Sequence, residues 1–225
     1  MTFMEKMGLI HGYFLGIFTA LISLLRSSRM FHPRGIVFGA QVDSHILPHE
    51  ALVRFSSAWW KNKEWPDALG IAIRFYEGNK EQDLLFASFS SPLLLLISPL
   101  ITNHKDYFGN AYYGVGLFER DGRIVKYQLR PRRTDRIQGS RKQRLEHDYL
   151  TREAILELLE EDQVSKRVEI IAVLRLIEKS EIDQEALRFS AFKNDLGIIP
   201  RGYLQYLRVG AYKLGQWARP KSSKS

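Results

Sequence analysis

The sequence predicts an α+β fold in which helices flank an antiparallel β-barrel. Three observations support this: long segments rich in β-branched and aromatic residues, an Asp-Gly dipeptide between two of them, and helical spacing of apolar residues near both ends of the chain. The chain has 225 residues, of which 45% are hydrophobic. A single domain of this size can bury a core large enough to enclose a cofactor.

Predicted strands follow one another along the chain. They have the apolar, β-branched and aromatic content of buried strands, and they cover residues 35–42, 51–56, 68–76, 83–89, 112–119 and 123–129. Asp121 and Gly122 separate the last two, and this dipeptide is a strong hairpin signal. Residues 168–177 alternate between apolar and charged side chains, which predicts a final strand. Long antiparallel strands of this kind are expected of a barrel or a strongly curved sheet.

Helices are predicted in three places. Residues 151–160 open with an N-cap residue, Thr151, and an early acid, and they continue with apolar residues at helical spacing. Residues 202–219 also predict a helix. The uncharged segment 8–25 predicts an apolar N-terminal helix, which either contacts a membrane or packs on the protein's own core. A second apolar run, residues 93–101, is too short to span a bilayer, so we expect it to be buried in the core.

The composition excludes several kinds of site. The chain has no cysteine, so disulfides, thiolate nucleophiles, iron–sulfur clusters and thiolate-ligated metals are absent, and any metal must use nitrogen or oxygen ligands. The net charge of +8 suits an anionic partner such as a nucleic acid, a membrane surface or an acidic cofactor. The densest basic run, from Arg130 to Arg144, lacks interleaved aromatic residues, which predicts a solvated loop and no nucleic-acid partner.

The residues that carry chemistry are concentrated near the end of the chain. On a helix, Arg208, Tyr212, Gln216 and Arg219 fall along one face. A cation one turn from a phenol favours the phenolate and lowers the pKa of the phenol, and phenolate is the form that binds iron. The same spacing also fits an amphipathic helix with an ordinary Tyr–Arg face.

This stretch resembles the proximal motif of the catalase family, R-x-x-x-Y-x-x-x-[HQ]-x-x-R. The resemblance implies a catalase-type barrel that binds haem, with Tyr212 as the axial iron ligand, Arg208 hydrogen-bonded to it, and Gln216 and Arg219 in contact with the cofactor. The stretch from Phe189 to Gln205 is similar to the family's approach to this helix, with one extra residue before Arg208.

Three earlier segments extend the resemblance. Residues 29–35, Arg-Met-Phe-His-Pro-Arg-Gly, resemble the family's R-x-x-H-x-[KR]-G element, which implies that His32 is the distal base and Arg29 a propionate partner. Val53-Arg-Phe-Ser56 resembles the A-R-F-S strand, which implies that Arg54 contacts the cofactor and Ser56 bonds the distal histidine. Residues 70–85 resemble the G-x-A-x-[KR]-F-Y segment and the G-N-x-D-L-V that follows it.

Two departures from the family bear on activity. After Asp83-Leu-Leu the family has an asparagine that orients peroxide, whereas this chain has Phe86-Ala-Ser-Phe89. The connection between residue 92 and the Asp121 hairpin is also much shorter than in a typical catalase, which predicts a more open pocket and peroxidase-like behaviour. The alternatives are a haem-binding or haem-free barrel without turnover, and a membrane-associated enzyme that rearranges lipid hydroperoxides.

We therefore expect a chain organised as an apolar helix (residues 1–28), a haem-binding barrel (29–220) and a basic tail (221–225). The implied function is a haem-dependent catalase or peroxidase that decomposes hydrogen peroxide or organic hydroperoxides. The expected partners are the peroxide, an organic reductant and a membrane surface contacted through residues 8–25, and oligomerisation stays open. We expect a cytoplasmic or peripherally membrane-associated protein.

Overall fold

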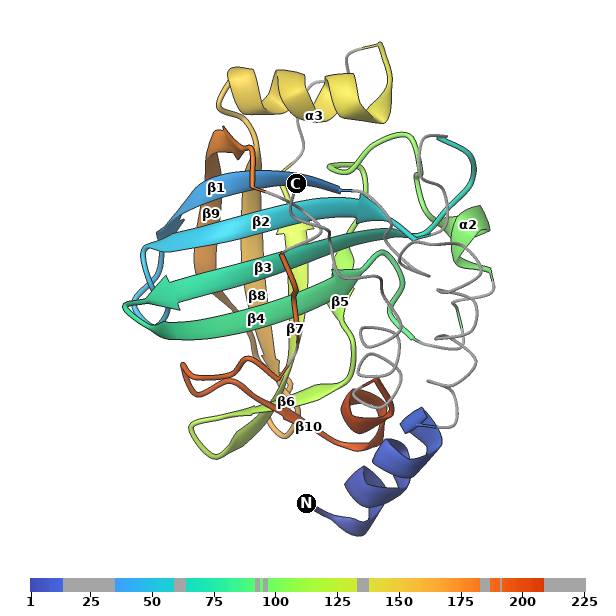
Figure 1. The fold of residues 1–225 in the computed structure, drawn as a ribbon, viewed down its shortest axis with the longest axis vertical. Helices are drawn as coiled ribbons and strands as arrows, with labels where there is room; N and C mark the ends of the chain where they lie inside the picture. Colours follow the sequence, from blue (N-terminus) through green and yellow to red (C-terminus); the bar gives the residue numbers. More distant parts are fainter. Residues whose placement is uncertain are drawn as a thin grey trace, which may run out of the picture.

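The computed structural model describes residues 1–13, 35–58, 64–91, 94, 97–132, 138–182, 187–190 and 192–208. Within these residues ten strands form one antiparallel sheet (Figure 1). The strands are β1 (Gly35–Asp43), β2 (Glu50–Ser57), β3 (Leu69–Glu77), β4 (Lys80–Ala87), β5 (Tyr112–Gly114), β6 (Leu117–Arg120), β7 (Arg123–Pro131), β8 (Ile155–Asp162), β9 (Val168–Ser180) and β10 (Ile199–Arg201).

The sheet closes on itself into a barrel. Its order is β10-β6-β7-β5-β4-β3-β2-β1-β9-β8, and an additional pairing of β7 with β8 joins the two sides. This pairing runs from Val125 opposite Asp162 to Pro131 opposite Leu156. Without β6 and β10, which extend one edge, eight of the ten strands form the closed ring. Closure pairs strand edges that would otherwise be exposed.

The barrel interior is an apolar core, and alternate residues of the long strands point into it. Phe38, Phe55 and Phe75 project into it from the first three strands and are fully buried. Phe38 and Phe55 meet edge to face, with ring centroids 6.0 Å apart. This alternation leaves Arg54, Ser56 and the intervening residues of neighbouring strands on the outer face of the barrel.

The predicted strands and the hairpin are confirmed. Residues 117–120 and 123–131 pair as β6 and β7 around Asp121 and Gly122, which have φ of 51° and 75°. These left-handed values suit the type of turn that Asp-Gly favours in a two-residue hairpin loop. Residues 112–119, predicted as one strand, are divided into β5 and β6 at Gly116, whose φ is 92°.

The helix predicted at residues 151–160 is wrong. This segment forms strand β8, and Thr151 instead ends the preceding helix, α3 (Arg141–Leu150). The register between β8 and β9 shifts between Leu158 and Leu159 and leaves Ile171 of β9 as the extra residue. In β8 itself, Leu156 and Leu158 face the core, whereas Leu159 lines a groove on the outside. Apolar residues on both faces of the strand stand next to each other in the sequence and imitate helical spacing.

The loop predicted for the basic run is wrong at both ends, and residues 133–137 between them lie outside the described residues. Arg130 belongs to β7, and the last residues of the run begin helix α3, where Ser140 and Gln143 form a reciprocal capping box. Arg141 is buried and donates to the carbonyl oxygen of His104 at 2.7 Å. The sequence Ser140-x-x-Gln143 is the signal that could have located this helix.

The apolar run 93–101 is not buried as predicted in the residues that are described. Ile97, Leu100 and Ile101 are 45%, 83% and 54% exposed, and helix α2 (Ser98–Ile101) carries the last two. Among the described residues, no helix is long and apolar enough to cross a bilayer.

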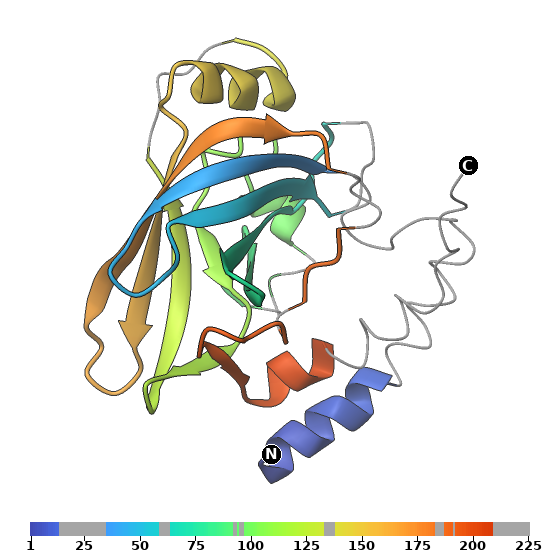
Figure 2. The ribbon, with the colours of Figure 1, turned by 60° about the vertical axis from the view of Figure 1, so that its left-hand side comes forward.

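A helix of residues 3–13 lies against a second helix of residues 203–208 (Figure 2). Gly8 and Gly12 face the carbonyl oxygens of Tyr203 and Leu207, and neither position leaves room for a Cβ atom. The His11 Nδ1 and the Tyr203 hydroxyl are 2.9 Å apart. The first part of the predicted N-terminal helix and of the predicted C-terminal helix are therefore confirmed, and they pack on each other.

Candidate functional site

Two of the site residues predicted from the sequence, Arg54 and Ser56, lie in the barrel wall, on the outer face of strands β1 to β4. The antiparallel registers align residues across this face in rows. One row reads Gly35, Ser56, Gly70 and Ala87, and the next reads Val37, Arg54, Ala72 and Leu85. Ser56 and Arg54 therefore stand side by side on this face, and the other positions of the two rows are small or apolar.

Ser56 has a defined hydrogen-bonding direction. Its side chain is buried, and its hydroxyl donates to the carbonyl oxygen of Gly70 at 3.3 Å. A hydroxyl has one hydrogen, so this bond leaves the lone pairs of Oγ as acceptors. Register pairs Ser56 with Gly35, three residues after His32 in the sequence.

Arg54 is buried to 4% exposure and lies across the glycine at the start of β1. A Cβ atom at Gly35 would be 2.8 Å from Nε of Arg54 and 2.6 Å from the carbonyl oxygen of Phe55. Glycine is therefore required at position 35 for the guanidinium to occupy its place. A buried guanidinium next to a flat apolar surface is a group suited to binding a carboxylate.

A covering segment, residues 187–190, lies on the same outer face next to Arg54 and crosses β3 and β4 (Figure 1). Leu187 and Phe189 pack on Val37 and Ala72. The segment thus buries part of the outer face that would otherwise meet solvent. Residues 192–198 continue along β4. Ile198 belongs to the inner core, and its backbone exchanges two hydrogen bonds of 3.2 Å with the side-chain amide of Gln82.

One buried ion pair anchors the covering segment. Arg74 donates to both oxygens of Asp83 at 2.6 and 2.8 Å and also to the carbonyl oxygen of Arg188. The backbone N–H of Ser190 donates to Asp83 at 2.7 Å, and the guanidinium lies 5.0 Å from the centre of the Phe189 ring. Burial opposes the charged form of Arg74, but the hydrogen bonds to Asp83 outweigh it and raise the pKa of Arg74.

Sequence reasoning noted Arg74 and Asp83 only as part of a matching segment and gave them no role. In the structure these two residues hold the covering segment next to Arg54. The available signal was Arg74 inside the otherwise uncharged run from Leu69 to Phe75, with Asp83 on the adjacent predicted strand.

The remaining predicted site residues are placed as follows. Arg208 lies at the end of the helix of residues 203–208. Arg29, His32, Tyr212, Gln216 and Arg219 lie outside the described residues. The structure therefore brings together Arg54 and Ser56 of the predicted set, and the others stay predictions.

A second polar cluster lies on the other side of the barrel. Arg120 donates to both oxygens of Glu160 at 2.6 and 2.8 Å, and the hydroxyl of Tyr127 donates to the same carboxylate at 3.0 Å. Burial tends to raise the pKa of Glu160, but the hydrogen bonds from Arg120 and Tyr127 lower it by more. The cluster joins β6, β7 and β8.

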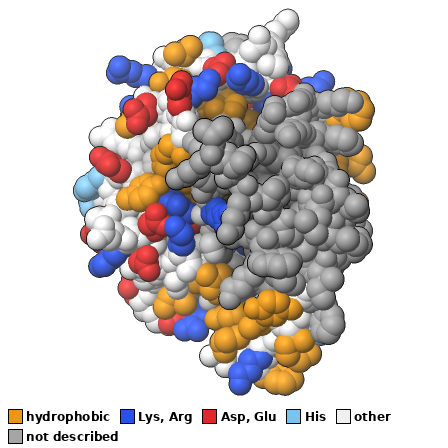
Figure 3. Space-filling model, in the orientation of Figure 1, with side chains coloured by type: hydrophobic (Ala, Val, Ile, Leu, Met, Phe, Trp, Pro, Cys, Tyr) orange, Lys and Arg blue, Asp and Glu red, His pale blue; other side chains and the backbone are white. Residues whose placement is uncertain are grey.

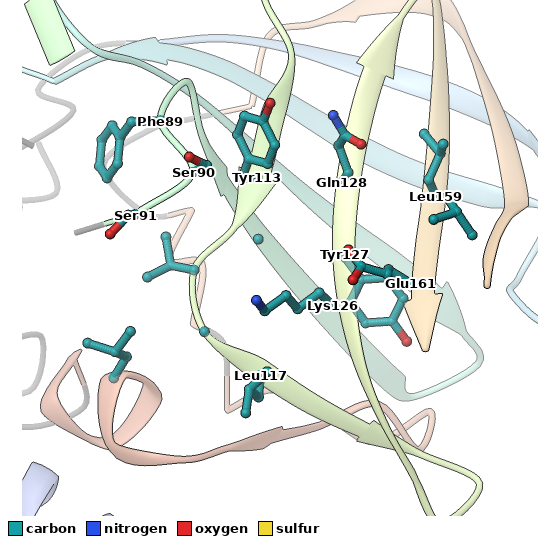
Figure 4. A pocket seen from close by; sticks show the side chains of 15 residues that line it. Phe89, Ser90, Ser91, Tyr113, Leu117, Lys126, Tyr127, Gln128, Leu159 and Glu161 are labelled. Carbon is teal, nitrogen blue, oxygen red and sulfur yellow. The ribbon is translucent and has the colours of Figure 1, made fainter. Parts of the chain in front are cut away.

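A groove with a volume of about 570 Å³ lies over β5, β7 and β8. Tyr113, Lys126 and Gln128 project into it, and Leu159 and Glu161 line its other side (Figure 4). A second cavity of about 410 Å³ lies near the β1–β2 turn. Neither cavity is lined by Arg54 or Ser56. Within the described part of the chain, no group of three or more His, Asp or Glu side chains could hold a metal ion.

Comparison with known proteins places this architecture. No protein-family model matches the sequence, and no curated protein matches it. Among solved structures, a bacterial catalase superposes with a TM-score of 0.63 at 12% sequence identity. The match covers 88% of this chain and 59% of the catalase. The barrel therefore has the catalase fold, as the sequence predicted, and the chain spans well under two thirds of that catalase.

Proposed function

We propose that this chain binds haem against the outer face of β1 to β4 and acts on peroxides as a catalase-like or peroxidase-like enzyme. The observation that carries the proposal is the pairing of Arg54 and Ser56 on this face of a catalase-type barrel. Both side chains are buried, and the positions around them are small or apolar. A flat apolar surface with one buried cation fits a planar macrocycle that carries carboxylates.

Bound haem would supply the oxidising chemistry towards peroxides. Tyr212 would hold the haem iron through its phenolate oxygen, and Arg208 would favour the phenolate form. Arg54, with Arg29 and Arg219, would neutralise the propionates, and Gln216 would contact the cofactor. These roles rest on the family motif, and only Arg54 and Arg208 belong to the described residues.

Ser56 would set the protonation pattern of His32. Because the hydroxyl of Ser56 already donates to Gly70, it can only accept a hydrogen from the imidazole. An Nδ1–H bonded to Ser56 leaves Nε2 of a neutral His32 free to take a proton from peroxide and return it to the leaving oxygen. The covering segment held by Arg74 and Asp83 would exclude water from one side of this surface.

A second candidate is a barrel that holds haem without turnover or holds none. Ala87 supports it, because Ala87 lies opposite Gly70 on the same outer face and close to where the family has its peroxide-orienting asparagine. A methyl group donates no hydrogen bond to peroxide, which removes stabilisation of the developing charge.

An absorption spectrum of the full chain, purified with haem supplied, tests the proposal. We expect a Soret band and a charge-transfer band of tyrosinate-ligated ferric haem. Tyr212→Phe should lose this spectrum, whereas Tyr206→Phe, a phenol earlier in the same predicted helix, should retain it. Steady-state rates with hydrogen peroxide alone, and with an added aromatic donor, then separate catalase from peroxidase activity.

Three results would contradict this assignment. A chain that takes up no haem would support the haem-free barrel. An unchanged spectrum in Tyr212→Phe would remove the proposed ligand. A haem-loaded chain that consumes no peroxide, with or without a donor, would support binding without turnover.

A further inference from the structure

The helix of residues 3–13 has two faces of different character. Glu5, Gly8 and Gly12 are buried against the rest of the protein, and Glu5 is only 2% exposed. The carboxylate of Glu5 accepts hydrogen bonds from the backbone N–H groups of Thr2 and Gly202 at 2.7 and 3.2 Å. Glu5 and the two glycines therefore form the side of this helix that packs on the rest of the protein.

The outward face of the same helix is apolar. Phe3, Met4 and Ile10 are 75%, 57% and 51% exposed, and Met7 lies half-buried between them. At 3.6 residues per turn these four side chains fall within an arc of about 120°, turned away from the glycine face. Figure 3 shows hydrophobic surface gathered at this end of the molecule. We call these four side chains the helix patch.

The charge around the helix patch is cationic. Lys6 is exposed beside the patch, whereas Glu5, the helix's acid, is turned inward. Burial tends to raise the pKa of Glu5, but the hydrogen bonds from the two backbone N–H groups outweigh it, so the carboxylate keeps its charge inside the protein. The chain as a whole carries a net charge of +8. An apolar surface with a lysine at its edge, on a basic protein, is complementary to a bilayer with anionic headgroups.

We propose that the helix patch docks this protein on the surface of an anionic lipid bilayer. One side of the helix of residues 3–13 is held against the helix of residues 203–208, so only its outward side would meet lipid. The helix would therefore lie in the headgroup region, with Phe3, Met4, Met7 and Ile10 inserted and Lys6 at the phosphates. Gly8 and Gly12 would keep the opposite side fixed to the helix of residues 203–208.

Sedimentation of the full chain with lipid vesicles tests the proposal. We expect the protein to sediment with vesicles containing about 30% phosphatidylserine and more weakly with phosphatidylcholine alone. Phe3→Ser combined with Ile10→Ser should lower the partition coefficient about tenfold, because two inserted apolar side chains are lost. Lys6→Glu should weaken binding to the anionic vesicles about fivefold, with a smaller effect on neutral ones.

A matched control uses apolar residues that are equally exposed elsewhere. Leu150 and Val164 are 75% and 90% exposed, at the end of α3 and in the β8–β9 turn. Leu150→Ser combined with Val164→Ser should bind vesicles as the wild type does. Thermal unfolding followed by circular dichroism should be unchanged in both double variants, because all four side chains are exposed.

Two outcomes would overturn the proposal. In the first, the wild type does not bind vesicles, or it binds them no more tightly than the helix-patch variant, Phe3→Ser combined with Ile10→Ser. The other is a concentration-dependent dimer in sedimentation velocity that the helix-patch variant abolishes, without vesicle binding, which would make the patch an interface between copies. Neither measurement depends on haem, so both stand apart from the test of the proposed function.

Discussion

Strands β3 and β9 belong to the same barrel but meet different surroundings. In β3, seven consecutive residues from Leu69 to Phe75 are buried. In β9, Ala172, Leu174 and Leu176 are buried and most of their neighbours are exposed or half-buried. The difference arises outside the barrel, because the covering segment lies over the outer face of β1 to β4, whereas much of the outer face of β9 meets solvent.

This comparison teaches where a functional surface can form. A strand that is buried on one face needs only an alternating pattern, and its outer side chains are free to vary. A strand that is buried on both faces must hold any charge in a hydrogen-bonded pair. Arg74 and Asp83 satisfy this requirement on the covered side, directly next to the row that contains Arg54.

The largest effect should come from breaking this pair. Arg74→Ala leaves Asp83 buried without its cation, and we expect the free energy of unfolding to fall by about 3–5 kcal/mol. Urea unfolding followed by fluorescence measures the change. The control is Arg132→Ala, because Arg132 donates to Glu157 at 2.9 Å with its own side chain 53% exposed. That substitution should cost less than about 1 kcal/mol. Equal losses in the two variants would show that burial under the covering segment does not make the Arg74–Asp83 pair more important than an exposed pair.

A smaller effect is expected from the cluster of Arg120, Tyr127 and Glu160. Glu160→Gln weakens the hydrogen bonds from Arg120 and Tyr127, and we expect a loss of about 2–3 kcal/mol at neutral pH. Glu157→Gln, on the solvent side of the same strand, should cost less than about 1 kcal/mol. Urea unfolding at pH 7 measures both.

The pH dependence of Glu160 gives a second readout of the same variant. The pKa of Glu160 in the folded state lies below its ordinary value of 4.5. Its contribution is therefore fully present above about pH 4.5 and is lost as the pH falls through the lower folded value. The stability of the wild type should fall faster than that of Glu160→Gln in this range. Parallel curves would contradict the assignment of the hydrogen bonds.

The smallest effect should come from the surface around Arg54. Gly35→Ala places a Cβ atom against the guanidinium and the Phe55 carbonyl, and we expect a loss of about 2 kcal/mol. Gly39→Ala lies on the same strand and face, but its Cβ atom would meet the flexible side chain of Glu178 at 3.0 Å. Its unfolding free energy should stay within about 1 kcal/mol of the wild type. If both variants were equally stable, Arg54 would not require a glycine neighbour.

Local patterns predicted part of the fold well. The β-branched runs of β1 to β4, the Asp121-Gly122 turn and the alternation of β9 were all read from neighbouring residues, and the structure confirms them. These features depend on side-chain period and turn geometry, which a short window of sequence contains. The catalase-type barrel was predicted from the order of several motifs along the chain.

The sequence by itself determined most residues of β1 to β7 and β9, and the positions of Arg54 and Ser56 on β2. Only the tertiary structure decided that residues 155–162 are a strand and that Ile97, Leu100 and Ile101 are exposed. It also decided that residues 187–190 cover the face next to Arg54. The physical reason is that strand pairing, barrel closure and burial by a distant segment depend on contacts between residues far apart in the chain, which no local period records.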